Sequence, residues 1–74
     1  MTVTLADIQK AATIIEGSVV RTPLVSMHHL HDILGFETFL KLENLQNIGS
    51  FKQRGALVKL KSLSAKEAKA GVIA

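Results

Sequence analysis

The sequence predicts an α/β fold with a mainly parallel sheet, because helical and strand patterns alternate along its 74 residues. Apolar residues recur at every third or fourth position over residues 5–16 and at every second position over residues 36–43. The chain is 47% hydrophobic and 20% charged, which is typical of a folded domain. A chain of this length buries only about 60% of its unfolded surface, so we expect at most one small domain.

The first helix is expected over residues 5–16. Thr4 followed by Asp7 three residues later is typical of a helix N-cap with an acidic partner. Gly17 supplies a residue that tolerates the left-handed conformation and ends the helix. One apolar stripe of this helix comprises Leu5, Ile8, Ala12 and Ile15.

A short edge strand and a second helix are expected next. Pro23 restricts Thr22 to extended conformations, and a short strand follows around Val25. Ser26 is expected to cap a helix of one to two turns that Gly35 ends. The buried side of that helix should comprise Leu30, Ile33 and Leu34.

A longer strand, a loop and two helices complete the pattern. Alternating apolar residues predict a strand over 36–43, followed by a polar loop over 44–49. Ser50 and Gln53 suggest a capping box for a helix that runs to about residue 60, with an apolar stripe of Ala56, Leu57 and Leu60. Ser64 and Glu67 repeat that pattern for a last helix, which Gly71 ends. The apolar residues 72–74 then predict the start of a buried strand, so we expect residues 1–74 to be an N-terminal fragment truncated within it.

Several classes of protein are excluded by composition. Without cysteine, neither a disulfide framework nor a thiolate metal site can form. No apolar run is long enough for a membrane span, and no signal peptide is recognisable, so we expect a cytoplasmic protein without a membrane partner. The net charge of +3 comes from scattered basic residues and three Phe are the only aromatics, which argues against a nucleic-acid partner.

Lys52 is the residue that the local pattern singles out. It falls in the first turn of an expected helix, directly after a strand and a loop, where ligands gather in open α/β sheets. We expect the positive end of the helix dipole to favour the neutral amine that imine formation requires. Gly49 and Gly55 remove side-chain bulk nearby, and Phe51 offers an apolar surface to a ring-shaped cofactor. A merely solvated lysine is the alternative interpretation of the same pattern.

The segment around this lysine closely resembles a known family. Residues 43–56, ENLQNIGSFKQRGA, are similar to the cofactor-lysine segment of threonine dehydratases and serine racemases, which are fold-type II pyridoxal-phosphate enzymes. The resemblance extends to VRTPL at residues 20–24 and KLENL at residues 41–45, and it covers essentially the whole chain. Phe51 before the lysine and Gln53 after it resemble the dehydratase and racemase branch. Asn47 and Ile48 depart from the Arg-Thr or Lys-Thr pair that is common there, so the resemblance does not extend to a nucleotide effector site.

The resemblance implies a cofactor, an activity and roles for individual residues. Pyridoxal 5'-phosphate would be held by Lys52 as the Schiff-base lysine, which would also move the α-proton of the substrate. Phe51 would pack against the cofactor ring, while Ser50 is interpreted as a helix cap and Arg54 as a structural partner. The intact parent would contain a three-layer parallel sheet, form a homo-oligomer and eliminate water from L-threonine or L-serine, giving a 2-oxo acid and ammonia. A serine racemase, another fold-type II lyase, or a non-catalytic remnant that acts as an interaction module are the alternatives.

The family's Ser-x-Gly-Asn-His segment and its phosphate-binding loop would follow Ala74, so we expect the 74 residues alone to be inactive.

His28, His29 and His31 form a second cluster that could suggest a metal site. Apart from Asp32, no carboxylate or thiol lies at a useful spacing, so exposed surface histidines are the better interpretation and no metal is expected.

Overall fold

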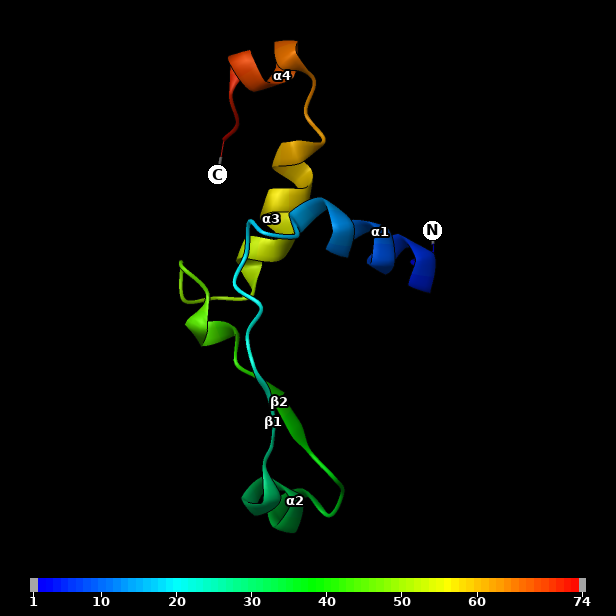
Figure 1. The fold of residues 1–74 in the computed structure, drawn as a ribbon, viewed down its shortest axis with the longest axis vertical. Coiled ribbons are helices and arrows are strands. Elements are labelled where there is room, and N and C mark those ends of the chain that lie inside the picture. Colours follow the sequence, from blue (N-terminus) through cyan, green and yellow to red (C-terminus); the bar gives the residue numbers. More distant parts are fainter. Residues whose placement is uncertain (1, 74) are drawn as a thin grey trace. The chain divides into compact units, whose positions relative to one another are not determined.

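A computed structural model describes residues 2–73 of the chain, which form helices and a two-stranded sheet (Figure 1). The order of the elements is α1 (Leu5–Ile15), β1 (Leu24–Ser26), α2 (His28–Leu34), β2 (Phe39–Lys41), the 3-10 helix η1 (Glu43–Leu45), α3 (Lys52–Lys61) and α4 (Ala65–Ala70). The chain divides into two compact units. We call residues 1–19 and 52–74 the helical unit, and residues 20–51 the strand unit.

The helical unit begins with the capping box that the sequence predicts. The Thr4 hydroxyl accepts a hydrogen bond from the Asp7 N–H at 3.2 Å, and the Asp7 carboxylate accepts one from the Thr4 N–H at 2.9 Å. α1 ends at Ile15, and Gly17 then adopts a left-handed φ of 78°. The predicted start and end of this helix are confirmed.

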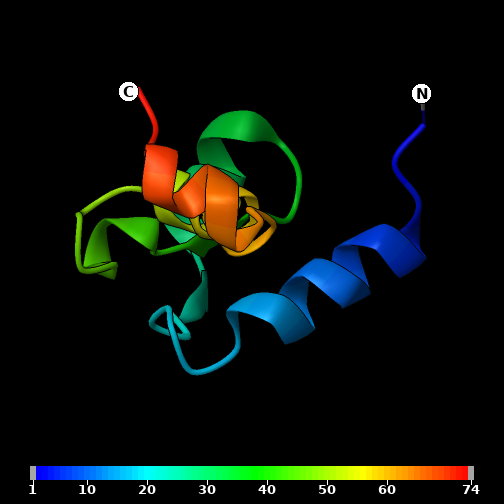
Figure 2. The same ribbon diagram turned by 90° about the horizontal axis from the view of Figure 1, so that it is seen from above.

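α1 packs against α3 within the helical unit. Ile15, at the end of α1, is 6% exposed and is the buried apolar residue of the described chain. The first turns of α1 project away from α3 in both views (Figures 1 and 2), and Leu5 and Ile8 are exposed there. Only the C-terminal end of the predicted stripe is therefore buried.

α3 begins at Lys52, one residue later than a helix with Ser50 as its N-cap would begin. Its half-buried apolar residues are Leu57 and Val58, whereas Leu60 is exposed. The Lys61 ammonium, at the end of α3, donates hydrogen bonds to the Ile14 carbonyl at 3.0 Å and to the Ser18 hydroxyl at 3.1 Å. A cation from α3 thus satisfies a carbonyl at the C-terminus of α1, where a positive charge is favourable.

α4 has the second predicted capping box, which is also confirmed. The Ser64 hydroxyl accepts from the Glu67 N–H at 3.1 Å, and the Glu67 carboxylate accepts from the Ser64 N–H at 2.8 Å. Gly71 ends the helix with φ of 84°. Val72 and Ile73 pair with no strand of the described residues, and Ala74 lies outside them, so the strand expected over 72–74 stays a prediction.

β1 and β2 form an antiparallel pair, and the mainly parallel sheet expected for the fold stays a prediction. The register places Leu24 opposite Lys41 and Ser26 opposite Phe39. The connection between them, residues 27–38, contains a helix of only two turns and returns the chain in the opposite direction (Figure 1). β2 covers three residues, not the eight predicted over 36–43, because β1 offers only three residues to pair with.

α2 begins later than predicted, because Ser26 pairs with Phe39 as the last residue of β1. Met27 occupies the N-cap position without a side-chain hydrogen bond, so the cap assigned to Ser26 is wrong. Gly35 ends the helix in the left-handed conformation, with φ of 79° and ψ of 13°, as predicted. On the expected buried side, Leu30 is half-buried, whereas Ile33 and Leu34 are exposed.

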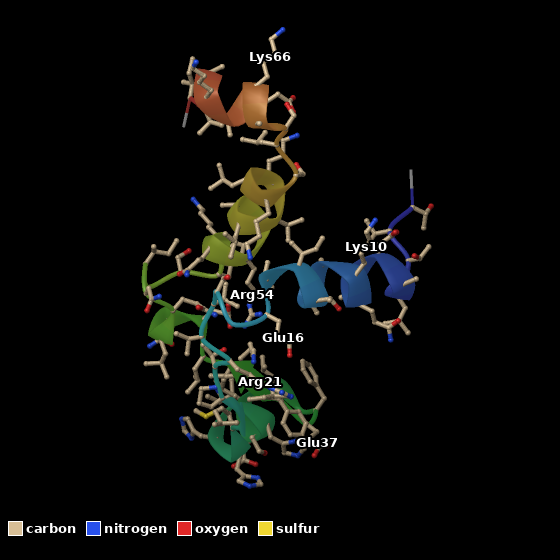
Figure 3. The ribbon with its side chains drawn as sticks, turned by 45° about the horizontal axis from the view of Figure 1, so that its top comes forward. Lys10, Glu16, Arg21, Glu37, Arg54 and Lys66 are labelled. Atoms are coloured by element: carbon tan, nitrogen blue, oxygen red, sulfur yellow. The ribbon has the colours of Figure 1, made fainter. Side chains whose placement is uncertain are left out.

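The basic residues of the helical unit are spread over three different helices. Figure 3 shows Lys10 on α1, Arg54 on α3 and Lys66 on α4. The lysine side chains are exposed and Arg54 is half-buried.

None of the described helices has the length and apolar character that would be needed to cross a bilayer.

Candidate functional site

Lys52 is the first residue of α3 and lies in an exposed position. Phe51 immediately precedes it, with 68% of its surface exposed. The N-terminus of an α-helix carries backbone N–H groups without partners inside the helix, and it attracts negatively charged groups. The structure therefore places the predicted lysine at a helix start, with an apolar ring next to it in the chain.

The loop before Lys52 is closed by a tight turn. The Gly49 N–H donates to the Gln46 carbonyl at 2.8 Å, and Gly49 has a left-handed φ of 73°. A residue with a side chain is strained in that conformation, so glycine is the favoured residue at this position. The predicted loop is thus ordered by a specific turn, which leads through Ser50 and Phe51 into α3. The capping box expected between Ser50 and Gln53 stays a prediction.

Gly55 leaves open space on the side of α3 that carries Lys52. Residues three apart share one face of a helix, so Lys52 and Gly55 lie along the same face. Apart from its chain neighbours and its own helix, no atom of residues 2–73 lies within 4 Å of a Cβ built at Gly55. The face of α3 beside the lysine therefore has room for a bound group.

The other candidate cluster, His28, His29 and His31, lies on α2 with all three side chains exposed. Among residues 2–73, no group of three or more His, Asp or Glu side chains is placed to hold a metal ion. The exposure of all three side chains agrees with the prediction of surface histidines.

A buried polar network in the strand unit was not expected from the sequence. Gln46, only 4% exposed, hydrogen-bonds the Val20 backbone at both its N–H (2.9 Å) and its carbonyl (2.8 Å). The sequence marks residues 44–49 only as a polar loop, and no local spacing connects them with residue 20. The signals that pointed to both segments were their resemblances to the family, VRTPL for Val20 and ENLQNIGSFKQRGA for Gln46.

Comparison with known proteins places this chain in a family. A family model described as "Pyridoxal-phosphate dependent enzyme" matches residues 15–74. The chain belongs to this family. Its cofactor is therefore pyridoxal phosphate, as the segment around Lys52 predicts. No solved structure matches the chain.

Several curated proteins resemble the chain over nearly all of its length. An L-threonine ammonia-lyase of Thermotoga maritima is 46% identical over 72 residues, which is 97% of this chain and 18% of that protein. A serine racemase of Dictyostelium discoideum is 42% identical over 72 residues, or 97% of this chain and 22% of that protein. An L-threo-3-hydroxyaspartate ammonia-lyase of a Pseudomonas species is 44% identical over 68 residues, or 92% and 21%. The chain thus spans about a fifth of the length of these relatives.

The residues at the start of α3 fit the family's cofactor. Lys52 is an exposed residue whose side chain ends in an amine, the group that forms imines with carbonyl compounds. Phe51 adds an exposed ring, and Gly55 leaves the adjacent helix face open. An amine, an apolar surface and open space are what a planar aldehyde cofactor needs at its attachment point.

Proposed function

We propose that the intact gene product is a pyridoxal-phosphate dependent dehydratase that releases ammonia and a 2-oxo acid from L-threonine or L-serine. The observation that supports it is the segment GSFKQRGA at the start of α3, in a chain that belongs to this family. Two of the relatives described above are ammonia-lyases, of L-threonine and of L-threo-3-hydroxyaspartate. All of these substrates are amino acids with a hydroxyl on the β-carbon.

In this proposal Lys52 has two roles. Its Nζ would hold the cofactor, and the same amine would take the proton from the substrate α-carbon. Pyridoxal phosphate supplies an electron sink for the charge that this proton transfer leaves behind. Phe51 gives the cofactor ring an apolar surface. The exposed position of Lys52 at a helix start allows its amine to reach both partners.

The larger architecture is part of the same proposal. Residues 1–74 would be the N-terminal part of a catalytic domain with a three-layer parallel sheet, in a cytoplasmic homo-oligomer. The lengths of the relatives support a larger catalytic domain, because the chain corresponds to 18–22% of each protein. Reading the nucleotide sequence beyond the codon for Ala74 tests it: a reading frame that encodes Ser-x-Gly-Asn-His is expected, and an immediate stop codon would favour the non-catalytic remnant.

Racemisation of serine is a second candidate, because one of the relatives is a serine racemase. The same Lys52 amine would take the α-proton in either reaction. The two differ in whether the β-hydroxyl is lost or a proton returns on the opposite face. Assays of ammonia and of D-serine on the same sample distinguish them.

The role of Lys52 is tested with the intact gene product. Borohydride reduction followed by peptide mass spectrometry should place the cofactor on Lys52, and Lys52→Ala should lose the cofactor's absorbance band and ammonia release. Lys66→Ala, which removes an exposed lysine from α4, is the matched control and should keep both. Undiminished ammonia release by Lys52→Ala, or an adduct on another lysine, would overturn the assignment.

A further inference from the structure

The buried side chain of Gln46 forms hydrogen bonds with both the backbone N–H and the backbone carbonyl of one residue, Val20. Its Oε1 accepts the Val20 N–H at 2.9 Å, and its Nε2 donates to the Val20 carbonyl at 2.8 Å. The Nε2 group also donates to Glu43 Oε2 at 3.3 Å. A pair of opposed hydrogen bonds to one residue is what a neighbouring antiparallel strand provides. Here a side-chain amide takes the place of that strand.

The same region is held by two further side-chain contacts. Glu43 Oε1 accepts the hydroxyl hydrogen of Thr22, which is 3% exposed, and the Lys41 ammonium donates to the Thr22 carbonyl. The backbone ladder between the two segments ends with the bond from the Leu42 N–H to the Pro23 carbonyl at 3.0 Å. Hydrogen bonds from side chains of residues 41–46 therefore extend the pairing to residues 20–22, beyond the last backbone hydrogen bond between the two segments.

The backbone of Gln46 connects this network to the loop that precedes Lys52. The Gln46 N–H donates to the Glu43 carbonyl at 3.1 Å, which closes η1. The Gln46 carbonyl accepts the Gly49 N–H at 2.8 Å, which closes the next turn. Gln46 is thus the residue at which the side-chain network and the turn toward Phe51 meet.

We propose that Gln46 is a positioning residue for Lys52. Its side chain anchors residue 46 on Val20, and the turn that its carbonyl closes with Gly49 leads along the chain into the first turn of α3. This inference rests on the proposed attachment of the cofactor to Lys52. It also gives a physical role to VRTPL and KLENL, two further segments that resemble the family, because they and Gln46 of the lysine segment supply both sides of the anchor.

The test compares Gln46→Met with Gln9→Met in the intact gene product. Methionine keeps the length of the side chain and removes the amide, so the Val20 N–H and carbonyl lose these two hydrogen bonds. Below its unfolding temperature, Gln46→Met should still carry the borohydride-trapped cofactor on Lys52, but with weaker circular dichroism in the cofactor band. Misplacement of a reacting group by about 1 Å can cost about 10²-fold in rate, so we expect kcat to fall by about 10- to 100-fold while KM changes little. Gln9 is exposed on α1, and its substitution should leave both unchanged.

A merely structural role would lower the melting temperature and leave kcat and the cofactor's circular dichroism unchanged, and that result would overturn the proposal. If Gln46→Met does not fold, Glu43→Gln is the second variant, since it weakens the bond from the Gln46 Nε2 group to residue 43 without removing the amide. It should lower kcat in the same direction by a smaller factor, and an unchanged kcat would again reject the role. An adduct on Lys52 in every variant with unchanged kcat would refute the positioning role alone. An adduct elsewhere in the unsubstituted protein would refute both proposals.

Discussion

The helix starts of the helical unit and the side-chain network of the strand unit are formed by hydrogen bonds of different range. In the helical unit, α1 and α4 each begin with a reciprocal pair of bonds between residues three apart. In the strand unit, the side chain of Gln46 binds a residue 26 positions away, and Thr22 and Glu43 are 21 positions apart. The helix starts are therefore local features, whereas the strand unit depends on contacts that form only when distant segments meet.

The largest effect is expected from Gln46→Glu in the strand unit. A carboxylate cannot donate to the Val20 carbonyl, and it places a second negative charge beside Glu43 in a buried position. We expect the free energy of unfolding to fall by about 3 kcal/mol, measured by denaturant titration of the intact gene product. Gln9→Glu on the exposed surface of α1 is the matched control, with an expected change within about 0.5 kcal/mol. Equal losses in both variants would contradict the importance of the network.

Removing a cap in the helical unit should have a smaller and local effect. Thr4→Ala and Ser64→Ala each delete a hydroxyl that accepts an N–H at the start of a helix. A loss of about 1 kcal/mol is expected for each, seen as faster amide hydrogen exchange in the first turn of the affected helix only. Thr2→Ala, outside α1, is the control. If either variant accelerated exchange in the strand unit, the separation between local and long-range stabilisation would fail.

Lys61→Met tests the long-range hydrogen bonds of the helical unit. The ammonium at the end of α3 donates to the Ile14 carbonyl and the Ser18 hydroxyl in an exposed position, where solvent weakens such bonds. We expect a destabilisation of about 0.5 kcal/mol by thermal unfolding, with Lys66→Met as the unaffected control. A loss as large as that of Gln46→Glu would mean that both units depend on distant contacts to the same degree.

The smallest effect is expected from pH. Hydrogen bonds from the Thr4 N–H and hydroxyl group hold the pKa of the Asp7 carboxyl below its usual value, and Ser64 lowers the pKa of Glu67 in the same way. Because these pKa values are lower in the folded state, the stabilisation is present above the usual carboxyl pKa and is lost as pH falls through the folded value. An NMR titration below pH of about 5 should shift the Thr4 and Ser64 amide resonances together with their carboxylates. Asp7→Asn should abolish the pH response at Thr4 and leave that at Ser64, and an unchanged Thr4 titration would disprove the assignment.

Much of the local structure could be predicted from short stretches of sequence. Thr4 with Asp7 and Ser64 with Glu67 mark helix starts, and Gly17, Gly35 and Gly71 mark ends, because each signal acts within about four residues. Ser26 was misinterpreted as a cap for the opposite reason. Its side chain suits a cap, but pairing with a strand formed by residues 39–41 takes it into β1.

The candidate site also combines features that the sequence predicts with features that only the structure shows. Sequence alone was sufficient to predict Lys52 at the start of a helix, the glycine near the end of the loop before it and the family to which its motif belongs. The folded chain was needed to show that β1 and β2 run antiparallel, that β2 is three residues long, and that Gln46 is buried against Val20. Caps and turns are decided by neighbouring residues, whereas strand pairing and a buried amide depend on which distant backbone groups need partners. No hydrophobic periodicity or motif spacing in the sequence shows which of these backbone groups need hydrogen-bond partners.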